Sequence, residues 1–151
     1  MQLAHYLGLL HRSEAELAKA FRAVARGHGD EPDVVGVCER LAAQCDGHVD
    51  RLAPVVERYG EEADDEPERL HGELFRGARS GGMGLLRDLH NLFLMASEAD
   101  ISWTMVAQAA QGVRDDELMG IVAACEGETA GQLRWLRTRM KQAAPQALVV
   151  A

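Results

Sequence analysis

The sequence predicts an all-α protein that folds as a four-helix bundle. Hydrophobic residues make up 47% of the 151 residues but aromatic residues only 5%, and the helix-favouring Ala, Leu, Arg and Glu are abundant. Along several stretches the apolar residues recur in alternating steps of four and three, which is typical of a helix face packed against other helices. At this length we expect one bundle domain, residues 1–144, followed by a C-terminal tail, residues 145–151.

The first helix is predicted over residues 2–28, and a glycine at each side of His28 ends it. Asp30 is the expected N-cap of the second helix, with Pro32 in its first turn and Gly60 at its end. Pro54 lies inside this second helix and removes one backbone hydrogen bond, so we expect a bend there.

Each of these two helices has an apolar stripe that a polar residue interrupts at mid-length. Glu14 lies between Leu10 and Leu17 in the first stripe, and His48 lies between Cys45 and Leu52 in the second. If the chain reverses tightly near residue 30, the antiparallel helices bring Glu14 opposite His48. The sequence therefore predicts an acidic and an imidazole side chain facing each other inside the bundle.

Residues 61–68 include six acidic residues and are expected to be a solvated linker, with a short extra helix at about residues 67–79. The third helix is predicted over residues 83–113. It is apolar around most of its circumference, so it should be buried on more than one side. We expect a homodimer contact through this helix, with a wider core within one chain as the alternative.

The fourth helix is predicted over residues 116–142. More than 20 residues separate the two helical hairpins, which is enough chain to return along the length of the second helix. The third helix would then run parallel to the second, giving a bundle with one long crossover. An up-down-up-down bundle is the main alternative.

The net charge and the cysteines indicate which partners and which cellular compartment to expect. The formal net charge of −8 opposes binding to nucleic acid. A small basic cluster lies at the C-terminal end of the fourth helix, where cations complement the helix dipole: Arg134, Arg137, Arg139 and Lys141. No apolar run approaches the roughly 20 residues that cross a membrane. The three cysteines lack a disulfide spacing, so we expect a cytoplasmic protein.

The order of helices and of polar residues resembles the ferritin-like superfamily, including rubrerythrin-type and bacterioferritin-type proteins. Their metal site takes a Glu from the first and third helices and a Glu-x-x-His from the second and fourth. Glu14 and Glu98 match the single glutamates, whereas residues 45–48 have Cys45 in place of the motif's Glu but keep His48. Residues 128–131 keep Glu128 but end in glycine instead of histidine.

The resemblance implies a metal site formed by Glu14, Cys45, His48, Glu98 and Glu128 with at most one divalent ion, Fe, Mn or Zn, since two of six ligands are lost. We expect a non-catalytic binding or structural protein with a decayed site. Glu14 and His48 would then form a buried pair without metal. The alternative is a diiron- or dimanganese-carboxylate oxidase, peroxidase or iron-handling protein with an altered ligand set. A third possibility is a bundle that binds an unidentified small molecule in an apolar pocket.

Overall fold

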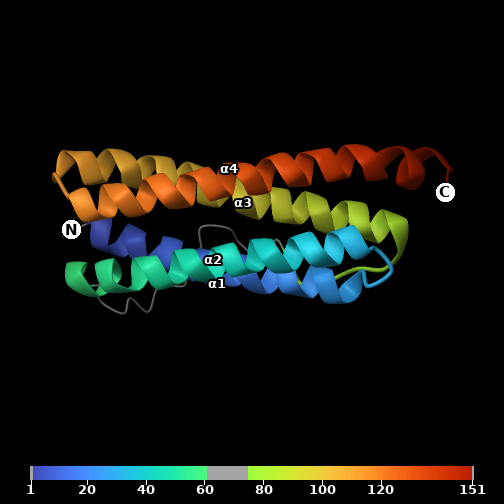
Figure 1. Ribbon diagram of the computed structural model, residues 1–151, viewed down its shortest axis with the longest axis horizontal. Helices are drawn as coiled ribbons and strands as arrows, with labels where there is room; N and C mark the ends of the chain where they lie inside the picture. The colour runs from blue at the N-terminus through green and yellow to red at the C-terminus, as the bar shows by residue number, and fades with distance from the viewer. Residues whose placement is uncertain (1, 61–74, 151) are drawn as a thin grey trace.

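The computed structural model describes residues 2–60 and 75–150. These residues form four long helices, α1 (Gln2–Gly27), α2 (Pro32–Tyr59), α3 (Gly81–Gly112) and α4 (Asp116–Pro145), and a terminal π-helical turn, η1 (Gln146–Val150). The helices lie side by side as a bundle, and the described ranges contain no strand (Figure 1). The predicted all-α four-helix bundle is thus confirmed. None of these helices is long and apolar enough to cross a membrane.

Contacts at the two ends of the bundle fix the directions of the helices. At one end His28, which follows α1, contacts Asp88 near the start of α3. At the other end Tyr59, the last residue of α2, donates a hydrogen bond to Asp115, which precedes α4. Helix α1 is therefore antiparallel to α3, whereas α2 and α3 run in the same direction (Figure 1). An up-down-up-down order would not produce these contacts.

The helix ends follow from local chemistry. Pro32 is the first residue of α2, where its fixed φ and missing N–H cost little. Gly60 ends the same helix in the left-handed conformation, at φ 67°, which glycine adopts without strain. The carboxylate of Asp115 caps α4 by accepting a hydrogen bond from the backbone N–H of Leu118 at 3.0 Å.

The apolar core has two separate clusters, and the break between them falls at a similar level in all four helices. On α1 the break lies between Leu10 and Leu17, and on α2 between Cys45 and Leu52. On α3 it lies between Ala99 and Trp103, and on α4 between Cys125 and Leu136. Six of the eight buried polar residues in the described ranges fall in these breaks: Ser13, Glu14, His48, Ser102, Thr129 and Gln132.

The other two buried polar residues, His28 and Asp88, close one end of the bundle. The Asp88 carboxylate lies 2.8 Å from Nε2 of His28 and accepts hydrogen bonds from the backbone N–H and the guanidinium of Arg79, at 2.8 and 2.7 Å. Gly27 lies so close to Ala78 that a Cβ atom at position 27 would overlap the alanine side chain. These contacts hold the segment before α3 against the end of α1.

Several details of the predicted elements differ from the structure. Glu31, not Asp30, precedes α2, and its side chain makes no capping hydrogen bond. Helix α4 continues to Pro145, three residues beyond the predicted end, because residues 141–144 favour helix. The tail forms η1, in which Leu148 and Val149 are 62% and 81% exposed. The predicted short helix at 67–79 lies mostly outside the described residues, and residues 75–79 are not helical.

Candidate functional site

Glu14 on α1 and His48 on α2 face each other in the middle of the bundle. One carboxylate oxygen of Glu14, Oε2, lies 3.1 Å from Nδ1 of His48. The two side chains are 1% and 0% exposed, so water does not screen the charge between them. The predicted register of the first two helices is confirmed at this pair. The site is built on long helices, whose packing fixes the positions of both residues.

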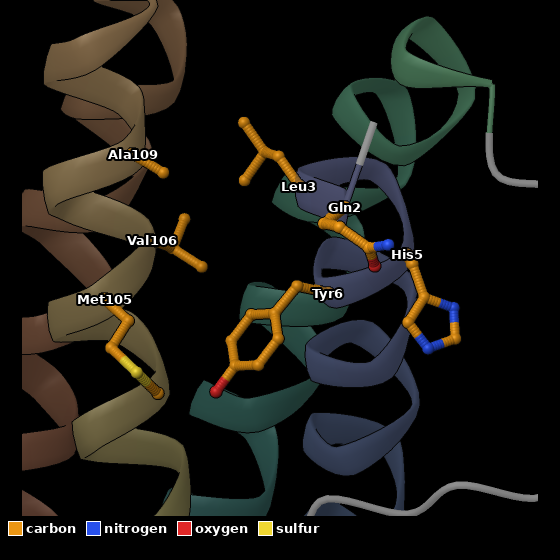
Figure 2. A pocket seen from close by; sticks show the side chains of 7 residues that line it. All are labelled: Gln2, Leu3, His5, Tyr6, Met105, Val106 and Ala109. Carbon is orange, nitrogen blue, oxygen red and sulfur yellow. The ribbon is translucent and has the colours of Figure 1, made fainter.

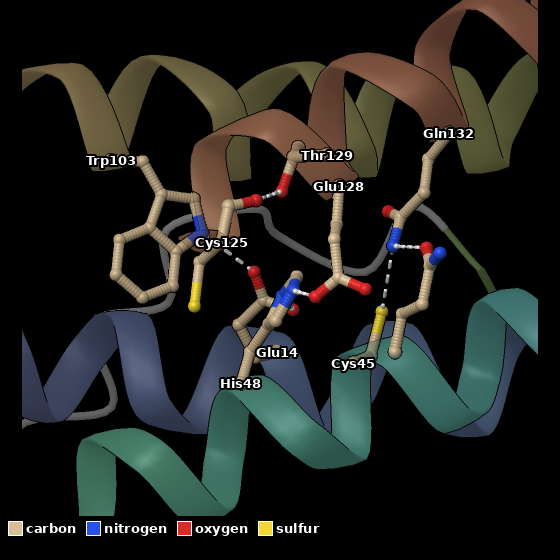
Figure 3. Close-up of polar contacts among 9 residues, drawn as sticks. Glu14, Cys45, His48, Trp103, Cys125, Glu128, Thr129 and Gln132 are labelled. Carbon is tan, nitrogen blue, oxygen red and sulfur yellow. Dashed lines mark hydrogen bonds and ion pairs between the residues drawn. The ribbon is translucent and has the colours of Figure 1, made fainter. Parts of the chain in front are cut away.

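The second oxygen of Glu14 has a different partner, which comes from α3. The indole N–H of Trp103 donates a hydrogen bond of 2.9 Å to Oε1 of Glu14 (Figure 3). The indole also packs against the imidazole of His48 in a T-shaped arrangement, with ring centroids 5.9 Å apart and an interplanar angle of 82°. The two oxygens of the Glu14 carboxylate thus have different partners. Oε2 faces His48, and Oε1 accepts the hydrogen bond from Trp103.

The fourth helix completes the network. Oε1 of Glu128 lies 3.1 Å from Nε2 of His48, so a carboxylate faces each nitrogen of the imidazole (Figure 3). The Glu128 side chain is 39% exposed, whereas His48 is fully buried. We call Glu14, His48, Trp103 and Glu128 the polar centre, to which each helix contributes one residue. The ring of His48 lies between the two carboxylates and joins α1 to α4.

This arrangement favours the imidazolium form of His48. A neutral imidazole has one N–H, so one of its nitrogens would direct a lone pair at a carboxylate, whereas the imidazolium can donate on both sides. Burial lowers the pKa of His48, but the close polar contacts and negative charges of Glu14 and Glu128 outweigh burial and raise the pKa above its ordinary value of 6.5. The Nδ1 atom and Oε2 of Glu14 have no well-aligned hydrogen bond, so charge is the main attraction between them.

Cys45, which stands where the resemblance expects a glutamate ligand, is fully buried one turn from His48. The amide N–H of Gln132 reaches its sulfur at 3.7 Å and also donates to Oε1 of Gln44 at 3.1 Å. Burial, and then the negative charge of Glu14, raise the pKa of Cys45 well above its ordinary range. The protonated thiol is therefore favoured, and a thiol is a poorer nucleophile than a thiolate.

Glu98, the expected ligand from the third helix, is partly exposed on α3. Burial raises the pKa of this carboxyl group. Its backbone carbonyl accepts a hydrogen bond from the hydroxyl of Ser102 at 2.7 Å. The contacts of the polar centre described above join Glu14, His48, Trp103 and Glu128.

The residues at the centre do not fit a two-metal site. Two of the six positions in the ferritin-like pattern are Cys45, a buried thiol, and Gly131, which has no side chain. In the part of the chain that the structure describes, no three His, Cys, Asp or Glu side chains are grouped so that they could hold a metal ion. The physical reason is that Glu14 and Glu128 lie on opposite sides of the His48 ring and do not converge on one point.

Several residues of the site were not predicted as such. Trp103 was not among the predicted site residues, and nothing in its spacing indicates that its N–H reaches Glu14. Gln132 and Thr129 interrupt the apolar face of α4 at the same level as Glu128, and Thr129 donates to the backbone carbonyl of Cys125 at 2.8 Å. A polar break in the fourth helix, aligned with Glu14 and His48, was the signal available in the sequence.

The fold and the site define a four-helix bundle with a buried carboxylate, imidazole and carboxylate in line. Comparisons with protein-family models, with curated proteins and with solved structures found no match for this chain. Function is therefore inferred from the polar centre itself.

Proposed function

We propose that this protein is a non-catalytic binding or structural bundle in which the polar centre aligns the four helices and no longer holds a metal pair. The observation that supports this most is that both ring nitrogens of His48 face carboxylates, each at 3.1 Å. A doubly protonated ring in this position carries the positive charge that a metal ion would otherwise supply. It balances the negative charge of Glu14 and part of that of Glu128, so no metal ion is required for neutrality.

The proposed role is specificity of packing. A buried charged group costs several kcal/mol to remove from water, so such groups are tolerated where they are paired and hydrogen-bonded. Sliding any helix by one turn would separate Glu14 from His48 and place a charge against an apolar cluster. The centre would therefore penalise incorrect alignments of the helices, as buried polar residues do in coiled coils.

Metal analysis of purified protein tests this proposal. Protein from cells grown with added iron, manganese or zinc is expected to contain less than one equivalent of metal. A Glu14→Gln/His48→Gln variant, whose folding is checked by circular dichroism, should contain the same amount. Two equivalents of iron or manganese in the wild type, lost in the variant, together with turnover of dioxygen or peroxide, would overturn the proposal in favour of an oxidase or peroxidase.

A single divalent cation is the second candidate, and one observation favours it. A metal-bound histidine commonly donates its other N–H to a carboxylate, which is the position of Glu14 at Nδ1 of His48. Glu128 is 39% exposed and has room to turn, so a cation replacing the proton on Nε2 could be bound by both residues. Zinc binding that weakens at least about tenfold in Glu128→Gln, and that releases a proton from His48, would support this candidate.

We also propose a homodimer through the outer face of α3 and a cytoplasmic location. Leu94, Ile101 and Met105 are 40%, 54% and 47% exposed, and their spacing of seven and four residues places them on one face of the helix. An exposed apolar row of this kind is typical of a contact surface. The location is supported by the three cysteines, which are all free thiols.

A further inference from the structure

A groove between α3 and α4 lies near the C-terminal end of the chain. Its volume is about 420 Å³, and apolar side chains form much of its wall, from Met83 and Leu86 on α3, Met140 on α4 and Leu148 on η1. The volume falls in the range of roughly 300–1,000 Å³ that small-molecule sites occupy. Met83 and Leu148 are 49% and 62% exposed, so a bound molecule would remove apolar surface from water.

The charged residues that line this groove within the described ranges are basic. Arg87 from α3 and Lys141 from α4 line it beside His90, and none of the described lining residues is acidic. The surrounding sequence has the same bias, because residues 81–97 and 129–150 contain five Arg or Lys and a single acid, Asp88. That aspartate is buried and already bound to His28 and Arg79. Of those five residues, Arg139 is already paired with Glu31 and Asp33. The positive charge at the groove is that of its lining residues Arg87 and Lys141, in a chain whose net charge is −8.

A second groove shows that this combination is not a general property of the helix surface. It has a volume of about 280 Å³ and lies between the start of α1 and the later part of α3 (Figure 2). Among the described residues its lining includes Leu3, Tyr6 and Met105 but no Lys or Arg, and the ring of His5 points away from α3 (Figure 2). The Tyr6 hydroxyl donates to Ser102 at 3.2 Å, so it is already partnered. The described lining of this second groove therefore offers no Lys or Arg to a negatively charged ligand.

We propose that the groove between α3 and α4 binds a single-chain anionic amphiphile, a medium-chain fatty acid. The alkyl chain would lie along Met83, Leu86 and Met140, and the carboxylate would meet Arg87 and Lys141 at the rim. Arginine and lysine bind carboxylates through charge-assisted hydrogen bonds. The distance along α3 from Met83 to His90 is about 10 Å at 1.5 Å per residue, which suits one short alkyl chain better than an extended macromolecular surface.

Calorimetric titration with decanoate, kept below the concentration at which it forms micelles, tests this proposal. Decanoate is expected to bind at one equivalent, and 1-decanol, which lacks the charge, at least about tenfold more weakly. An Arg87→Gln/Lys141→Gln variant should lose at least about tenfold in affinity. The matched control is Lys19→Gln/Arg26→Gln, which changes the net charge equally at exposed sites on α1 and should bind as the wild type does.

The apolar part of the site needs its own variant. Leu148→Asn replaces an exposed side chain, so it should leave the fold unchanged while lowering the affinity for decanoate. Equal binding of decanol and decanoate, or full affinity in the Arg87→Gln/Lys141→Gln variant, would overturn the proposal. Binding to vesicles that contain anionic phospholipid, without binding of free decanoate, would also overturn it and would indicate a membrane surface as the partner.

Discussion

Glu14 lies 3.1 Å from His48 in a region of the core where both side chains are almost fully buried. Burying such a pair costs free energy. Removing only one of the two residues costs more, because the remaining charge stays in the apolar interior without its partner. The first consequences to measure are therefore those of removing one member.

Replacing Glu14 with alanine should destabilise the protein by about 3–5 kcal/mol, because His48 loses a partner and the N–H of Trp103 loses its acceptor. Urea unfolding followed by circular dichroism measures this change. Glu39→Ala, at an exposed position on α2, is the matched control and should change the free energy of unfolding by less than about 0.5 kcal/mol.

A double variant shows whether the two residues act as a unit. Glu14→Leu/His48→Leu removes both buried charges, and Glu128 can turn toward solvent because it is already 39% exposed. The double variant should be more stable than the sum of its two single changes predicts, by about 0.5–3 kcal/mol. Strict additivity of the three free energies would contradict a coupled centre.

Stability should depend on pH through His48. The charged or titratable groups around it are Glu14, Glu128, Cys45 and Cys125, and the two carboxylates raise its pKa above 6.5. Since the folded state binds this proton more tightly, its stabilising contribution is complete below pH 6.5 and is lost as pH rises through the raised pKa. The difference in free energy of unfolding between the wild type and His48→Gln should therefore shrink as pH rises. A difference that grows over that interval would mean that His48 is neutral in the folded protein.

Trp103→Phe should lower the free energy of unfolding for a reason other than the smaller volume of the side chain. Phenylalanine keeps most of the packing but has no N–H, so Oε1 of Glu14 would remain buried without its donor, at a cost of about 1–3 kcal/mol. Trp135→Phe, which is only partly buried on α4, is the comparison and should cost less. Equal losses of unfolding free energy in the two variants would show that the hydrogen bond to Glu14 contributes nothing.

The three cysteines should resist alkylation in the folded protein. Burial raises the pKa of Cys38 and Cys125 to about 12, the latter with a contribution from Glu14, and burial raises that of Cys45 well above its ordinary range. Iodoacetamide at about pH 8 reacts with thiolates, so mass spectrometry should find no rapid labelling until urea is added. Rapid labelling of Cys45 alone in folded protein would instead indicate a reactive thiol at the polar centre.

The outer face of α3 offers a test of assembly. Ile101 is 54% exposed, so Ile101→Glu should leave the fold intact while placing a charge in the proposed contact. Light scattering is expected to find a dimer for the wild type and a monomer for this variant. Thr138→Glu, at an exposed position on α4, should remain dimeric. A wild-type protein that is monomeric at all concentrations would rule out the contact.

Much of the fold was predictable because apolar spacing and helix-ending residues are local signals. Gly60 ended α2 where expected, and the opposition of Glu14 and His48 followed from one short reversal. The position of Trp103 relative to Glu14 was not predictable, because it depends on how α3 rotates and shifts against α1. The groove near Lys141 depends in the same way on the packing of α3 against α4 and on the extension of α4 beyond residue 142.

The break that divides the apolar core has a consequence for local opening. Because the two clusters meet at a charged level and not through continuous apolar contact, each half of the bundle has a partly independent set of stabilising contacts. Amide hydrogens on the two sides of Glu14 should therefore exchange with solvent through separate opening events of different free energy, although they lie on the same uninterrupted helix.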